Sequence, residues 1–190
     1  MALAWYATVG GQEIEQGDVL FDLPTPRVVK LDPVEGPKVA VSRGNYVVLS
    51  QTCDLVNDKV SEILVANVHS YRKMVAASNC ADRAKSSSFH KSLVQGADVA
   101  YFLLPEHVEE PSLDWALVDF HHLRLVDKSL CKEHAALMGE RLRMISPYKE
   151  HLAQAFGRYM MRVALPETLH PFEKVGPNIV REEKDKNQAR

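Results

Sequence analysis

The chain has 190 residues, of which 46% are hydrophobic and 25% are charged, and its formal net charge is −2. This composition matches an average globular domain and provides enough apolar side chains for a core. The near-neutral charge excludes a strong overall attraction to nucleic acid or to an anionic membrane, although it leaves room for a local basic face.

The sequence also carries signals about location. No apolar run approaches the roughly 20 residues that a membrane-spanning helix needs, and the first residues lack the basic segment of a signal peptide. The three cysteines, Cys53, Cys80 and Cys131, form no CxxC pair, and their odd number argues against a disulfide framework. We therefore expect a cytoplasmic protein without a membrane partner, with one domain over 1–173 and a polar, disordered tail over 174–190.

The first half of the chain predicts short strands. A strand is expected within 14–23, and residues 27–31 and 38–42 alternate apolar and polar side chains as half-buried strands do. Residues 45–50 and 62–68 are continuous runs rich in β-branched side chains, which is typical of strands buried on both faces.

The next part of the chain has a different character. Residues 71–78 fit a short helix, and residues 80–88 predict a mobile surface loop within an insertion at about 78–98. Strands are expected at 99–104 and over 113–126, which the pattern divides into two strands after Phe120.

The strongest helix signal lies near the C-terminus. Ser146 is a favourable N-cap, and Pro147 follows at the first helical position. From there, apolar residues recur at spacings of three and four up to the helix-ending Pro166, which predicts an amphipathic helix. Short strands followed by such a helix favour an α+β fold, in which a small, strongly bent sheet or barrel is covered by the helix.

Four segments occur in the order found in the MazF/PemK toxin family. Residues 16–22 resemble its opening strand, 46–50 its central "VVLS" strand, 122–127 a late strand, and 139–146 the final strand before the helix. The resemblance implies an SH3-like barrel with a C-terminal helix. Since many members are sequence-specific endoribonucleases of toxin–antitoxin systems, it also implies RNA as a substrate.

The sequence departs from the family at positions that matter for catalysis. The family often has Arg-Pro before the central strand, but here Gly44 and Asn45 occupy that place, and Arg43 comes one residue earlier. His69 stands where the family has a threonine. The chain therefore resembles the family more closely in the segments that form its fold than in the positions of its active site.

The segment 50–55, with the sequence SQTCDL, ends a buried strand and brings polar side chains to the rim of the sheet. We expect the side chains of Gln51, Thr52 and Asp54 to form a binding rim, with Cys53 facing inward. Cys53 would be a nucleophile only if a base such as His69 activated it, because the adjacent carboxylate opposes thiolate formation. The alternative is that Cys53 is a small buried hydrophobic residue and Asp54 caps a turn.

A catalytic role is predicted for three residues near this rim: Arg43, His69 and Asp54. His69 is suited to general acid–base catalysis, and Arg43 is suited to stabilising charge on a phosphoryl group. The alternative for His69 is a strand-end histidine whose hydrogen bonds are satisfied by the backbone.

Two further groups of side chains are candidate ligands. His121 and His122 are adjacent in a predicted strand, where neighbouring side chains point to opposite faces, so we predict no shared metal ion and no cofactor. Arg141 and Arg143 share a strand face and are predicted to bind phosphate groups, the alternative being a solvated surface balanced by nearby carboxylates.

Two functional hypotheses follow. The first is a MazF/PemK-like nucleic-acid-binding protein that acts as an endoribonuclease toxin or defence effector through Arg43 and His69. The second is a catalytically inactive barrel that binds a protein or ligand in a bacterial defence or toxin–antitoxin system. The expected partners are RNA, a cognate antitoxin or another protein, and a second copy of the chain in a homodimer.

Overall fold

A computed structural model describes residues 4–77 and 81–161 of the chain. The strands are β1 (Tyr6–Gly10), β2 (Val19–Asp32), β3 (Gly36–Val48), β4 (Glu62–Ser70), β5 (Tyr101–Leu104), β6 (Ala116–Asp127) and β7 (Glu140–Met144). The helices are α1 (Thr52–Val56), α2 (Tyr71–Ala76), α3 (Ala81–Lys85), α4 (Ser87–Val94), α5 (Lys128–Met138) and α6 (Tyr148–Met160). Within the described residues, no helix is both long and apolar enough to cross a membrane.

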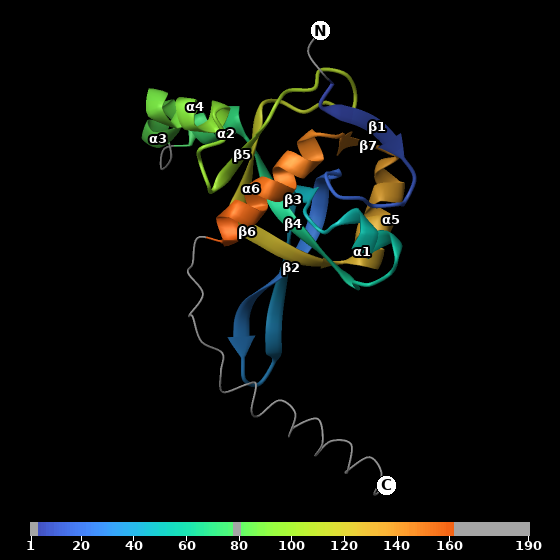
Figure 1. The fold of residues 1–190 in the computed structure, drawn as a ribbon. Coiled ribbons are helices and arrows are strands. Elements are labelled where there is room, and N and C mark those ends of the chain that lie inside the picture. The colour runs from blue at the N-terminus through green and yellow to red at the C-terminus, as the bar shows by residue number, and fades with distance from the viewer. Residues whose placement is uncertain (1–3, 78–80, 162–190) are drawn as a thin grey trace, which may run out of the picture. The chain divides into compact units, whose positions relative to one another are not determined.

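The strands form antiparallel sheets, so the predicted α+β class is confirmed. Five strands pair in the order β2-β3-β4-β6-β5, and β1 pairs separately with β7 (Figure 1). The buried central strands that were expected at 45–50 and 62–68 correspond to the inner part of β3 and to β4. Most of their apolar side chains are buried, on both faces of the sheet.

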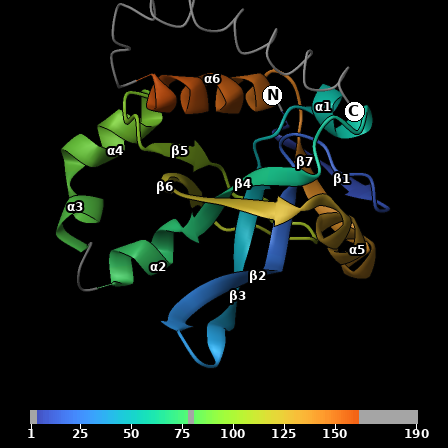
Figure 2. The ribbon, with the colours of Figure 1, turned by 90° about the horizontal axis from the view of Figure 1, so that it is seen from below.

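Three apolar clusters cover the two faces of the five-stranded sheet. On one face, Ala66, Val68 and Val118 pack with Leu152 and Ala155 of α6. The opposite face has two separate clusters. One gathers side chains of β4 with Leu55 of α1 and with Cys131 and Ala135 of α5. The other joins Leu117 to Phe89 and Leu93 of α4, and Figure 2 shows α5 and α2–α4 toward opposite ends of the sheet.

The outer half of the β2–β3 hairpin extends away from the other elements in both views (Figures 1 and 2). The strands predicted at 27–31 and 38–42 are present, but the prediction that they are half-buried is wrong. Val28 pairs with Val39 and lies beside Val41 on one face of the hairpin, and these three side chains are 55%, 57% and 66% exposed. Strand alternation indicates which side chains share a face, but it cannot tell whether another element covers that face.

Two helical predictions had different outcomes. The C-terminal amphipathic helix is confirmed as α6, which begins just after Ser146 and Pro147. Residues 80–88 were expected to be a loop, but α3 and α4 occupy most of the insertion. The hydroxyl of Ser86 accepts a hydrogen bond from the backbone N–H of Phe89 and caps α4, whose buried Phe89 and Leu93 anchor it to the sheet. Cys80, Pro166 and the predicted tail at 174–190 lie outside the described residues.

Candidate functional site

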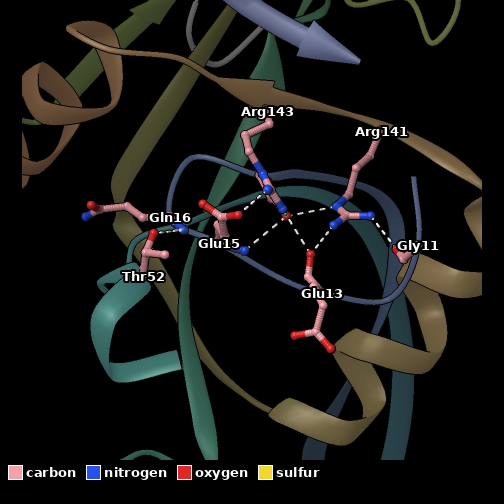
Figure 3. Close-up of polar contacts among 8 residues, drawn as sticks. Gly11, Glu13, Glu15, Gln16, Thr52, Arg141 and Arg143 are labelled. Carbon is pink, nitrogen blue, oxygen red and sulfur yellow. Dashed lines mark hydrogen bonds and ion pairs between the residues drawn. The ribbon is translucent and has the colours of Figure 1, made fainter. Parts of the chain in front are cut away.

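Arg141 and Arg143 on β7 point toward the segment between β1 and β2 (Figure 3). The carboxylate of Asp18, which is fully buried, accepts hydrogen bonds from Nε of Arg141 at 2.8 Å and from Nη2 of Arg143 at 2.9 Å. The guanidinium of Arg141 also donates to the backbone carbonyls of Gly11 and Glu13, and Arg143 forms an ion pair with Glu15. Both arginines therefore hold this segment against β7.

This geometry replaces the predicted phosphate-binding stripe with a structural network. Arg141 is completely buried, and its Nε, Nη1 and Nη2 groups are all bonded to oxygen atoms of the protein. The side chain of Arg143 is 19% exposed and makes the same kind of contacts. The two residues do share one strand face, as expected, but that face is turned inward because Asp18 pairs with both of them.

The SQTCDL segment fastens the same region to the sheet. The hydroxyl of Thr52 accepts a hydrogen bond from the backbone N–H of Gln16, and the side chain of Gln16 donates to the carbonyl of Leu49. After Leu49 the chain forms the one-turn helix α1, in which Asp54 pairs with Lys59 at 3.3 Å and Gln51 is exposed at the N-cap. Among the described residues, no hydrogen bond or ion pair connects this segment to His69 or Arg43.

Cys53 is exposed and does not face inward as expected, whereas Cys131 lies on the buried face of α5. Burial, assisted by the charge of Asp127, raises the pKa of the Cys131 thiol to about 12. In a Cys80→Ser variant at pH 8, we expect a thiol-reactive dye to label Cys53 within seconds to minutes and Cys131 only as the protein unfolds. Mass spectrometry of the labelled peptides measures both rates, and rapid labelling of Cys131 would contradict its burial.

Arg43 lies in the hairpin, where its guanidinium forms an ion pair with Asp22 at 2.8 Å. Both residues line a cavity of about 600 Å³ whose other walls include Phe21, Glu133 and His134. His69 does not line this cavity, and the side-chain hydrogen bonds of Arg43 within the described residues go to Asp22. The predicted partnership of Arg43 with His69 is therefore not formed by any direct polar contact.

His69 instead belongs to a cluster that the sequence did not predict, formed with Asp119, His121 and His122. We call these four residues the histidine cluster. Asp119 is paired with Asn67 of β4, and His69 is paired with Leu117, so these side chains share one face of the sheet. Residues 120–122 of β6 have no partners in β4, because Ala66 pairs with Leu123 and the next residue already pairs with Asp119. This bulge interrupts the regular alternation that would place the side chains of His121 and His122 on opposite faces of the sheet. Both rings therefore reach the same carboxylate.

The side chain of Asp119 is only 5% exposed and is held from several directions. Its Oδ1 accepts hydrogen bonds from the backbone N–H of His121 at 2.9 Å and lies 3.1 Å from Nδ1 of the same residue. Its Oδ2 lies 2.8 Å from Nδ1 of His122 and 3.7 Å from Nε2 of His69. The three imidazoles remain 46% to 63% exposed, so a buried carboxylate orients a group of solvent-facing rings.

The cluster shifts the pKa values of two of its members. Burial alone would raise the pKa of Asp119, but hydrogen bonds from His122 and from the backbone and ring of His121 outweigh it and lower the pKa. Burial lowers the pKa of His69, although the charge of Asp119 opposes that shift. Asp119 is therefore a carboxylate at neutral pH, and the neutral form of His69 is favoured.

Aromatic rings surround His121. Its ring centroid lies 5.9 Å from that of Tyr101 and 5.7 Å from that of Tyr159. The guanidinium of Arg83 lies 5.5 Å from the centroid of Tyr101 and also pairs with Asp98. The histidine cluster thus combines three imidazoles and one carboxylate, with aromatic rings and a cation close by. Asp119 could have been considered from the sequence because it lies between two apolar residues on a buried strand, two residues before the paired histidines.

A comparison with models of known protein families finds none that matches this chain, and a comparison with curated proteins finds no match. The function is therefore inferred from the chemistry of the histidine cluster.

Proposed function

We propose that the chain is a MazF/PemK-like endoribonuclease whose reaction centre is the histidine cluster. One observation carries the proposal: three imidazoles converge on the buried carboxylate of Asp119 and remain open to solvent. The resemblance of the four segments to MazF/PemK proteins supports RNA as the substrate. The proposed fold is the SH3-like barrel of that family, and the antiparallel pairing of β2-β3-β4-β6-β5 is compatible with it.

RNA carries its own nucleophile, because the 2′-hydroxyl lies next to the phosphodiester. Attack by its oxygen on phosphorus releases the 5′-oxygen of the next nucleotide and leaves a 2′,3′-cyclic phosphate. The protein must then orient the chain, stabilise the charge on phosphorus and provide for proton transfer. Imidazole groups fixed by a carboxylate can stabilise the charge on phosphorus and transfer protons. Tyr101 and Tyr159 offer rings on which a base can stack, which would orient the RNA.

The test is cleavage of defined RNA oligonucleotides by the purified full-length protein, with the product ends identified by mass spectrometry. We expect cyclic-phosphate ends, and we expect the His69→Ala variant to cleave at least about 100-fold more slowly. The His151→Ala variant is the matched control, because His151 is an exposed histidine on α6. If His69→Ala and wild type cleave RNA at equal rates, the cluster is not the reaction centre.

A second candidate is a non-catalytic module that binds a second copy of the chain. The specific observation in its favour is the exposed apolar face of the β2–β3 hairpin, with Val28, Val39 and Val41. Exposed apolar patches of this kind mark interaction surfaces. Absence of RNA cleavage by wild type, together with a change from oligomer to monomer in a Val39→Lys/Val41→Lys variant, would favour this candidate.

A further inference from the structure

We infer that His69, Asp119 and His122 bind one divalent first-row transition metal ion. One potential ligand atom from each residue lies within 4.8 Å of the others. The distances from Oδ2 of Asp119 to Nδ1 of His122 and to Nε2 of His69 are 2.8 and 3.7 Å. Two ligand atoms at about 2.1 Å from a metal are about 3.0 to 3.4 Å apart in octahedral or tetrahedral geometry. The two distances to Oδ2 lie on either side of this range, and the ligand nitrogens of His69 and His122 lie within 4.8 Å of each other, so side-chain rotations would be needed to bring all three ligand atoms onto one ion.

The two oxygens of Asp119 have different surroundings, and the difference favours a metal at Oδ2. Oδ1 is held by the backbone N–H and the ring of His121, which would keep the carboxylate oriented when an ion binds. Oδ2 faces the two other histidines. Binding would require Nδ1 of His122 to lose its proton to solvent and to exchange its hydrogen bond for a bond to the metal.

The ligand set indicates the class of ion. Imidazole nitrogens suit zinc, copper, iron and nickel, whereas magnesium, calcium and manganese prefer oxygen ligands. Three protein ligands leave at least one position open, as in catalytic metal sites. The side chains of His69 and His122 are 46% and 63% exposed, so the open position would face solvent. A phosphate oxygen of RNA could occupy it, where the ion would stabilise the developing charge.

The inference rests on the proposed function for the role of the ion in cleavage, but metal binding itself can be measured without RNA. Full-length protein freed of metal with EDTA is titrated with Zn²⁺ by calorimetry and with Co²⁺ by visible absorption. We expect one ion per chain, and we expect His69→Ala and His122→Ala to weaken Zn²⁺ binding about 100-fold or more. His151→Ala should bind Zn²⁺ as wild type does.

Two results would overturn the inference: no Zn²⁺ bound by wild type, or equal affinity in wild type and in both cluster variants. Thermal unfolding establishes that each variant is folded, and the Co²⁺ spectrum of wild type reports nitrogen ligation independently of any variant. RNA cleavage that persists in EDTA without bound metal would rule out a role for the ion in cleavage and would still support the proposed function. One bound ion per chain without RNA cleavage would support the metal site and contradict the proposed ribonuclease activity.

Discussion

Replacing Asp18 with asparagine is expected to lower the free energy of unfolding by about 3 kcal/mol or more. The carboxylate is completely buried between Arg141 and Arg143, and it also accepts a hydrogen bond from the backbone N–H of Glu15. An amide of the same size removes the negative charge but leaves two guanidinium groups beside it. The cost arises mainly from the buried cation of Arg141, which loses its charged partner. Urea unfolding followed by circular dichroism measures the change.

The matched control is the same substitution in an exposed ion pair. Asp22 pairs with Arg43, and both side chains are more than half exposed, so Asp22→Asn should change the free energy of unfolding by less than about 1 kcal/mol. Asp22 has a φ of 52°, a conformation that asparagine also tolerates, so the control introduces no backbone strain. Equal effects of the two substitutions would show that burial of the Asp18 network does not matter for stability.

The strands could be predicted because their signal is local. Continuous β-branched runs gave the inner part of β3 and β4, and the three- and four-residue spacing gave α6. Helix α5 was not predicted, although Asp127 and Gly139 bracket it. Asp127 caps α5 by accepting hydrogen bonds from Ser129 and Leu130, and Gly139 ends it with a φ of 77°. These two residues are the signals that could have identified it.

Long-range pairings could not be predicted in the same way. Arg141 and Asp18 are 123 positions apart, and nothing local distinguishes a buried arginine from one on the surface. The sequence predicts a site role for His69 but not its partners, because the bulge at residues 120–122 reverses the expectation from strand alternation. A bulge depends on the pairing of two strands and cannot be seen in either strand alone.

On the proposed ribonuclease function, replacing Asp119 with asparagine is expected to slow RNA cleavage by about 100-fold. The amide has one acceptor oxygen and no charge, so it cannot both hold His121 and face His69 and His122 as the carboxylate does. The imidazoles lose their fixed orientation, and the inferred metal site loses its only anionic ligand. Because the carboxylate orients the imidazoles and contacts no group of the RNA itself, we expect the loss to appear in the rate constant at saturating RNA.

Asp114→Asn is the control, because Asp114 is an exposed carboxylate that precedes β6 and pairs with Arg72 outside the cluster. Single-turnover cleavage by the two variants and wild type, with rates scaled to the folded fraction from thermal unfolding, separates chemistry from stability. The proposal that three oriented imidazoles carry out cleavage requires the carboxylate of Asp119, which orients them. A folded Asp119→Asn protein that cleaves RNA as fast as Asp114→Asn would therefore show that the arrangement around Asp119 is structural, and that the reaction centre lies elsewhere.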